Sequence, residues 1–205
     1  MQFVDYYFNL PEETIAFDEE LLKSAESGQM GETLRFWESK EYFVVIGRAG
    51  KASEDCFLDR CREDGIKIIR RVSGGGTVLQ GPGCLNYSLI LSYDRDERFR
   101  NIRASYEIIL IMIMASLTGR VSFHPISDLA FNGKKFSGNA QARKKKYFLH
   151  HGTILYDFNL DMIPRYLKHP IKEPEYRNGR THKDFLTNIP INPEEFKEAV
   201  KREFL

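Results

Sequence analysis

Hydrophobic and polar positions follow helical spacing in some segments of the chain and strand alternation in others. A helix is predicted over residues 11–27, because Pro11 suits a first helical position and Gly28 can close the end. Strands are predicted where aromatic and β-branched residues gather, at 33–38, 42–46, 66–71, 86–92 and 150–157. This interleaving of helices and strands predicts a mixed α/β or α+β domain.

Three further segments carry clear local signals. Ser53 can cap a helix over residues 53–62, with Gly65 as its terminator. The most apolar helix is predicted over residues 103–118 and is expected to be buried, with Gly119 ending it.

A last helix is predicted to begin at Asn192-Pro193. Phe196, Val200 and Phe204 then fall on one helical face.

Composition and charge narrow the class of protein. The 30 basic and 29 acidic residues give a net charge of +1, so we expect no nucleic-acid partner. The longest apolar run, 108–115, is far shorter than the about 20 residues of a membrane span, and the N-terminus does not resemble a signal peptide. Cys56, Cys61 and Cys84 are odd in number and lack metal-ligand spacing. We therefore expect a cytoplasmic protein without a membrane partner.

The first segment that carries chemistry is the run R-R-V-S-G-G-G-T-V at residues 70–78. Consecutive glycines let a backbone bend sharply and present its N–H groups to a ligand. Such groups suit carboxylate or phosphate oxygens, and an adjacent arginine adds a charge with fork geometry. A glycine-rich turn beside a solvated arginine is the alternative. The P-loop pattern is not matched, nor is G-x-G-x-x-G, because Leu79 stands at its last glycine.

The second segment is N-G-K-K-F-S-G-N-A-Q at residues 132–141. Its Asn-Gly pair lies between two strand-like runs, which predicts a tight hairpin. Strand alternation would place Lys135, Ser137 and Asn139 on one face. A lysine on a rigid strand can neutralise two anions that are brought together, such as a carboxylate and an α-phosphate. A solvent-facing lysine pair is the alternative.

Other polar features are weaker. His150 and His151 are adjacent on a predicted strand and face opposite ways, so they favour a structural or substrate-orienting role over a metal site. Asp128 could hold a metal on a nucleotide, or could be a simple turn aspartate. The Lys144-Lys145-Lys146 run suits a solvated loop, or a patch for an acidic carrier domain.

Together these segments resemble the lipoate–protein ligase family, which shares its catalytic domain with biotin ligases. The motifs stand in the family's order: VVIGR at 44–48, RRVSGGGTV at 70–78, LNYS at 85–88, KKFSGNAQ at 134–141, HHGTIL at 150–155 and FLTNI at 185–189. The match runs from about Phe8 to Ile189. Several motifs in one order are far more specific than any single motif.

The resemblance implies an α+β fold with a mostly antiparallel central sheet packed with helices, as one catalytic domain over residues 1–205. It implies a reaction in which lipoate and ATP, with Mg²⁺, give lipoyl-adenylate. The acyl group then passes to a lysine of a lipoyl domain of a 2-oxoacid dehydrogenase, or of the glycine-cleavage H protein. Lipoate and octanoate are not distinguished, because their acyl chains are equally long.

The resemblance also implies roles for matching residues. Lys135 is the expected catalytic residue, in contact with the lipoate carboxyl group and the phosphate. The nucleotide-contacting residues are Arg71, Gly76, Thr77, Val78, Leu79 and Lys135. The substrate-binding residues are Arg71, Ser73, Gly74, Gly75, Gly76, Gln80, Asn86, Ser137, Gly138, Ala140, His151 and Gly152. Asp128 is the candidate metal residue. An apolar wall for the acyl chain is expected, but sequence alone does not name its residues.

The chain departs from the family pattern at two points. Gln80 stands where the family often has a histidine, and glutamine cannot titrate near neutral pH. Many stand-alone ligases carry a C-terminal accessory domain, for which 205 residues leave no room. We expect that a separate accessory subunit supplies it, that the enzyme works without it, or that one half-reaction is lost.

Three alternatives to an ATP-dependent ligase are open. An octanoyl or lipoyl transferase would need no ATP but would need a nucleophilic cysteine. The three cysteines lie at or before Cys84, away from the Lys135 strand and His151, where such cysteines sit. A biotin ligase has a glycine loop interleaved with arginine. A non-catalytic lipoate or lipoyl-domain binder would not need the charge of Lys135.

Overall fold

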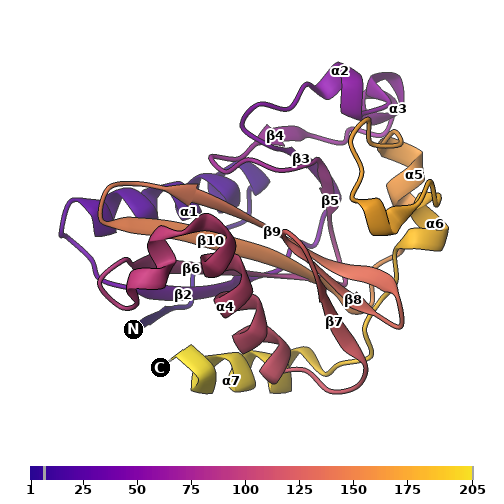
Figure 1. Cartoon of the computed structure of the whole chain (residues 1–205). Coiled ribbons are helices and arrows are strands. Elements are labelled where there is room, and N and C mark those ends of the chain that lie inside the picture. Colours follow the sequence, from indigo (N-terminus) through magenta and orange to yellow (C-terminus); the bar gives the residue numbers. More distant parts are fainter. Residues whose placement is uncertain (7, 205) are drawn as a thin grey trace.

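The central sheet of the computed structural model has seven strands, and the structure describes residues 1–6 and 8–204 (Figure 1). In spatial order the strands are β1 (Gln2–Val4), β2 (Thr33–Trp37), β6 (Cys84–Ser92), β10 (Tyr147–Leu155), β9 (Lys134–Arg143), β8 (Asp128–Phe131) and β7 (Val121–His124). Strands β1 and β2 pair in parallel, and the other neighbours are antiparallel. The predicted α+β fold with a mostly antiparallel central sheet is confirmed.

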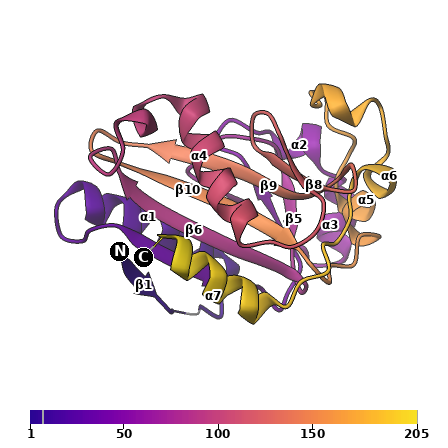
Figure 2. The ribbon, with the colours of Figure 1, turned by 60° about the horizontal axis from the view of Figure 1, so that its bottom comes forward.

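Helices cover both faces of this sheet. Helix α1 (Pro11–Glu26) packs on one face, and α4 (Ile102–Ala115) with α7 (Pro193–Phe204) on the other (Figures 1 and 2). Side chains of β6 alternate between the faces: Tyr87 enters the core with α4 and α7, whereas Ile90 packs with α1. None of the helices in the described ranges combines the length and hydrophobicity that a bilayer crossing requires.

A smaller three-stranded sheet packs beside the large one. It consists of β4 (Ile68–Arg70), β3 (Phe43–Ile46) and β5 (Val78–Gln80). Around it lie the short helices α2 (Ala52–Asp55), α3 (Leu58–Glu63), α5 (Met162–Tyr166) and α6 (His182–Phe185); the 3-10 turns are η1 (Glu97–Arg100) and η2 (Glu175–Arg177). The glycine-rich run connects β4 to β5 and reaches the large sheet, since Ser73 Oγ lies 2.6 Å from His151 Nε2 of β10.

Most predicted elements are confirmed, but the single helix over residues 53–62 is wrong. The segment forms α2 and α3, with a break at Cys56, and α2 begins after Lys51 with no side-chain cap. Cys56 is extended and forms a β-bridge with Leu167, and the Phe57 N–H donates to the Tyr166 carbonyl (2.9 Å). Pairing with a distant segment therefore overrides the local helix propensity.

A β-bulge in β9 changes the face on which Lys135 lies. The register of the β8–β9 pair shifts midway, so β9 carries one extra residue there. Ser137 and Asn139 share a face, since Asn139 Nδ2 donates to Ser137 Oγ (3.2 Å). Lys135 lies on the opposite face, where a Cβ on Gly138 would come within 3.0 Å of its Nζ. The prediction that groups Lys135 with Ser137 and Asn139 is therefore wrong.

Gly152 provides a test of how closely the central strands pack. A Cβ there would lie 1.8 Å from Asn139 Oδ1 and 2.7 Å from the Tyr87 hydroxyl, which donates to that oxygen. We predict that Gly152→Ala lowers the free energy of unfolding by about 3 kcal/mol through overpacking and loss of this buried hydrogen bond. Chemical denaturation measures the change.

Gly31→Ala is the matched control, because a Cβ at Gly31 meets nothing within 4 Å. It should change stability by no more than about 0.5 kcal/mol. Equal losses in the two variants would contradict the packing argument.

Candidate active site

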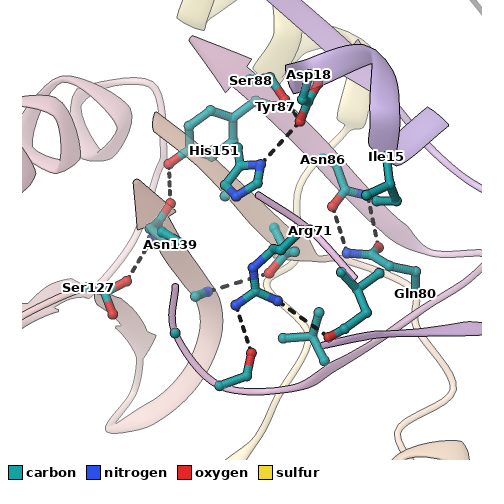
Figure 3. Close-up of a pocket in the computed structure, with 18 of the residues that line it drawn as sticks. Ile15, Asp18, Arg71, Gln80, Asn86, Tyr87, Ser88, Ser127, Asn139 and His151 are labelled. Carbon is teal, nitrogen blue, oxygen red and sulfur yellow. Dashed lines mark hydrogen bonds and ion pairs between the residues drawn. The ribbon is translucent and has the colours of Figure 1, made fainter. Parts of the chain in front are cut away.

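A cavity of about 160 Å³ lies between the two sheets, beneath α1 and the glycine-rich run. One side of it is apolar and is formed by Ile15, Trp37, Val45 and Val78. That this apolar side holds an acyl chain, as the family resemblance implies, stays a prediction. Ile15 belongs to α1, so this helix roofs the cavity as well as covering the sheet (Figure 3).

A second cavity of about 640 Å³ continues from the first. The two share the lining residues Gly75, Gly76, Thr77, Val78, Ser127, Asp128, Lys135, Gly138 and Thr153. Its outer side comes from α5, α6 and the segment around Pro170. Lys135 and the glycine loop therefore lie at the border between the smaller and the larger cavity.

Arg71 holds the shape of the glycine loop. Its Nη2 donates to the carbonyls of Gly74 (2.6 Å) and Gly76 (2.8 Å), and its Nε donates to Ser73 Oγ (3.0 Å). Burial lowers the pKa of Arg71 to about 10, so the guanidinium stays charged at neutral pH. Most of its donors are spent on the loop itself. Its expected contact with an anionic ligand therefore stays a prediction.

The 44–48 and 70–78 motifs meet in space. A Cβ on Gly47 would lie 2.2 Å from the Gly75 carbonyl oxygen, so only glycine fits there without a shift. The Arg48 N–H donates to the Ser73 carbonyl (2.8 Å). Arg70 donates through Nη1 to the carbonyls of Gly47 and Arg48 (2.9 Å each), which fixes the neighbouring turn.

A chain of hydrogen bonds runs from α1 through His151 to the glycine loop, and Figure 3 shows its first link, between Asp18 and His151. Asp18 Oδ2 lies 3.1 Å from His151 Nδ1 and accepts from Ser88 Oγ (2.7 Å). His151 Nε2 lies 2.6 Å from Ser73 Oγ. With Nδ1 protonated, His151 donates to Asp18 and accepts from Ser73. The order resembles a Ser-His-Asp triad, but Ser73 is 1% exposed and lines neither cavity, so it anchors the loop.

Asp18 also pairs with a buried cation. Its Oδ1 accepts from Arg35 Nη1 (2.8 Å), and both side chains are buried. Burial opposes ionisation of Asp18, but the hydrogen bond from His151 and the charge of Arg35 outweigh it and lower the pKa of Asp18. The carboxylate is therefore ionised at neutral pH and fixes the position of His151.

Four further polar side chains of the smaller cavity are paired among themselves. Gln80 and Asn86 exchange two amide hydrogen bonds of 2.9 Å. Tyr87 donates to Asn139, whose Nδ2 donates to the Ser127 carbonyl (2.8 Å; Figure 3). Paired polar groups gain little from a polar ligand, so the inner part of this cavity suits an uncharged chain.

Lys135 lies where the two cavities meet. Its Nζ lies 2.8 Å from Asp128 Oδ1, and Asp128 Oδ2 accepts from the Tyr176 hydroxyl (2.9 Å). In the described residues, no group of three or more histidine, cysteine, aspartate or glutamate side chains is placed to hold a metal ion. Asp128 is therefore the ion-pair partner of Lys135, and its role as a metal ligand stays a prediction.

Most of the predicted site residues come together. Those lining the smaller cavity are Arg71, Gly75, Gly76, Thr77, Val78, Gln80, Asn86, Asp128, Lys135, Gly138, Ala140, His151 and Gly152. Gly74, Leu79 and Ser137 line only the larger cavity.

Sequence reasoning missed Asp18, Trp37 and Tyr176. A signal for Asp18 was available: with Thr14 it forms a polar pair at helical spacing among otherwise apolar buried positions of α1.

The fold and site define an α+β protein with an apolar small-molecule cavity beside a glycine loop and a lysine. The model of the lipoyl protein ligase A/B catalytic domain matches residues 10–205. The chain belongs to this family.

Two curated relatives show the range of the family. The probable lipoate-protein ligase A of Mycoplasma pneumoniae is 30% identical over 159 residues, which are 78% of this chain and 46% of that protein. The octanoyltransferase LipM of Brevibacillus brevis is 26% identical over 226 residues, covering 95% of this chain and 82% of that protein. The chain spans 46% to 62% of the length of three lipoate–protein ligase relatives.

A solved structure has the same fold. The bi-partite lipoate protein ligase of Thermoplasma acidophilum, described with its E2 lipoyl domain, superposes with a TM-score of 0.81 at 26% identity. The match covers 98% of this chain and 80% of that one.

The buried pair of Asp18 and Arg35 generates a stability prediction. Asp18→Asn should lower the free energy of unfolding at pH 7 by about 3–5 kcal/mol, because it leaves the Arg35 charge buried and unpaired. The folded pKa of Asp18 lies below its ordinary value, so its contribution is complete above about pH 4 and is lost as pH falls through the folded pKa. Denaturation at several pH values should show the difference from wild type shrinking below about pH 4.

Asp59→Asn serves as control, since Asp59 pairs with Arg62 on the surface (3.2 Å). This change should cost no more than about 1 kcal/mol. A similar loss in both variants would refute the special role of the buried pair.

Proposed function

We propose that this chain acts as the catalytic part of an ATP-dependent lipoate–protein ligase. It activates lipoate as lipoyl-adenylate and transfers the lipoyl group to a lysine of a lipoyl carrier domain. The observation that carries this proposal is the position of Lys135, whose ammonium borders both cavities. A carboxylate at the end of the smaller cavity and an α-phosphate in the larger one would meet at this charge.

The two cavities suit the two substrates in different ways. The paired polar groups and the apolar wall of the smaller cavity favour an uncharged acyl chain, with only its carboxylate at Lys135. The larger cavity is bordered by Gly74, Gly75 and Gly76, whose backbone N–H groups suit phosphate oxygens. Lipoate in the first and ATP in the second is the arrangement that these surfaces support.

The proposed chemistry has two steps. A lipoate carboxylate oxygen attacks the α-phosphorus, forming the acyl–phosphate bond and expelling pyrophosphate. The amine of the carrier lysine then attacks the acyl carbonyl carbon, so that an amide forms, AMP leaves and the amine loses a proton. Lys135 stabilises the negative charge that builds up between carboxylate and phosphate. Mg²⁺ would enter with ATP on its phosphate oxygens, beside the ion pair of Asp128 and Lys135.

The relatives support the proposed partner. The Thermoplasma acidophilum ligase is described with an E2 lipoyl domain, and a further structure of a protein from that organism, 25% identical to this chain, holds lipoic acid. We therefore propose lipoyl domains of 2-oxoacid dehydrogenases as carriers, with the glycine-cleavage H protein as a second candidate. An accessory subunit is a further proposed partner, because the similar Thermoplasma acidophilum ligase is described as bi-partite.

ATP-free octanoyl transfer is the second candidate, favoured by the similarity to LipM. The cysteines weigh against it. Burial raises the pKa of Cys56 to about 11 and raises the pKa of Cys84 still further, and each side chain is 1% exposed. A thioester intermediate needs an accessible thiolate, and these environments disfavour one.

Intact-mass analysis of an apo lipoyl domain tests the proposal. One reaction contains this protein, lipoate, ATP and Mg²⁺; a parallel reaction contains an octanoyl carrier protein without ATP. We expect the lipoyl mass gain only with ATP. A gain only from the octanoyl carrier would establish the transferase. Silence in both reactions would contradict an enzyme that works without a partner chain.

Lys135→Ala should lower the rate of lipoyl-adenylate formation by about 10²–10³-fold, because a charge at the reacting atoms is lost. Lys134→Ala is the matched control: Lys134 precedes Lys135 on β9 but is exposed, and its loss should leave the rate near wild type. Adenylate formation is followed as pyrophosphate release with lipoate and ATP. If Lys135→Ala formed lipoyl-adenylate as fast as Lys134→Ala, the proposed role of Lys135 would be wrong.

Cys84→Ala separates the two candidate functions further. A ligase should retain its activity in this variant, since Cys84 is almost fully buried at the wall of the larger cavity and adenylate formation needs no thiol. Loss of acyl transfer in a protein that still unfolds cooperatively would instead point to thioester chemistry.

A further inference from the structure

Asp128 is shared between Lys135 and a tyrosine from a distant part of the chain. The aspartate is 6% exposed; one carboxylate oxygen accepts from Lys135 Nζ (2.8 Å) and the other from the Tyr176 hydroxyl (2.9 Å). Tyr176 lies in η2 and lines neither cavity. Contact with substrate therefore does not account for the placement of this hydroxyl.

The Tyr176 ring is held rigidly. It stacks on His124 of β7 with ring centroids 4.0 Å apart and planes 16° apart, and its centroid is 5.1 Å from that of Phe185. Burial and the neighbouring Asp128 charge raise the pKa of Tyr176, so the hydroxyl keeps its proton and donates to the carboxylate. The hydrogen bond thus has one fixed direction throughout the physiological pH range.

The segment that carries Tyr176 is also tied to the backbone around Lys135. Arg180 Nη1 donates to the Gly133 carbonyl (3.1 Å), and its Nη2 donates to the Tyr176 carbonyl (2.7 Å). Further along the chain, the Thr187 N–H donates to the Lys135 carbonyl (2.9 Å). The segment 176–187 therefore hydrogen-bonds directly to the main chain of Lys135. It contacts the Lys135 ammonium indirectly, through Asp128.

We propose that Tyr176 is a positioning residue that acts through Asp128 to hold the Lys135 ammonium at the junction of the two cavities; the consequence for the reaction rests on the proposed ligase function. Tyr176 bonds the carboxylate oxygen that Lys135 does not contact, and so favours binding of Lys135 to the other oxygen, which also accepts from Ser127 Oγ (3.3 Å). An ammonium has three N–H donors, so the others stay available for a substrate carboxylate and phosphate. Without the tyrosine hydroxyl, the buried carboxylate has an unpaired oxygen and turns to bind Lys135 with both.

The test compares Tyr176→Phe with Tyr156→Phe. Tyr156 is also half-buried and donates to a carboxylate, Glu38 (2.9 Å), but lines neither cavity. Tyr176→Phe should lower kcat for adenylate formation about tenfold, as expected for a small displacement of a reacting group, while KM for lipoate and ATP changes less than about twofold. Tyr156→Phe should leave kcat near wild type. Equal losses of kcat in both variants would overturn the proposal.

A double-mutant cycle with Asp128→Asn tests whether the effect passes through Asp128. Tyr176→Phe should cost little further kcat in the Asp128→Asn background, because the carboxylate that transmits the effect is gone. A full tenfold loss in both backgrounds would show that Tyr176 acts by another route.

The environment of the Lys135 side chain can also be measured in the protein without substrates, so this test does not depend on the proposed reaction. The ¹³Cε resonance of Lys135, assigned by its disappearance in Lys135→Arg, should move in Tyr176→Phe and stay in place in Tyr156→Phe. An unmoved resonance in Tyr176→Phe would refute positioning. Absence of adenylate with wild-type protein would instead refute the proposed function, and the resonance would still decide the role of Tyr176.

Discussion

The burial of Asp18 against Arg35 is the constraint on which the cavity depends. A buried charge is costly unless it is paired, so this ion pair fixes how α1 packs against β2. The Arg35 guanidinium also lies 5.0 Å from the centre of the Phe17 ring and 5.8 Å from that of Trp37. Among the described residues its Nε and Nη2 have no hydrogen-bond partner, and the rings supply part of its stabilisation. From Asp18, hydrogen bonds continue through His151 and Ser73 to the glycine loop.

This arrangement separates the polar groups of the site into two kinds. Within the smaller cavity, Gln80 pairs with Asn86 and Tyr87 with Asn139, so their polarity is satisfied before any ligand arrives. Where the two cavities meet, the Lys135 ammonium forms an ion pair with Asp128 and has further N–H donors for a ligand. A ligand with an apolar body and one anionic end matches this distribution. Under the proposed function, lipoate and octanoate would match this cavity equally well, so we infer that the groups around the carboxyl end separate a ligase from a transferase.

Local sequence signals determined much of the fold. Residues 11–27 carry their own start and stop signals, and α1 (Pro11–Glu26) forms there. The Asn132-Gly133 pair adopts positive φ at both residues (50° and 76°), as a tight hairpin requires. Phe196 and Phe204 lie at helical spacing and are buried, as predicted. The order of the glycine, lysine and histidine motifs was sufficient to predict the family, because each motif is a short run of adjacent residues. The catalytic role of Lys135 stays a prediction.

Tertiary structure decided what depends on residues far apart in the chain. The bulge in β9 turned Lys135 to the cavity face, against simple alternation. Pairing of Cys56 with Leu167 broke a helix that local propensity favoured. Asp18 and His151 are separated by 133 positions, and Tyr176 and Asp128 by 48, so no local pattern connects them. Local propensity acts between near neighbours in sequence, whereas the groups that orient this site meet only when α1, the sheet and the segment after β10 pack together.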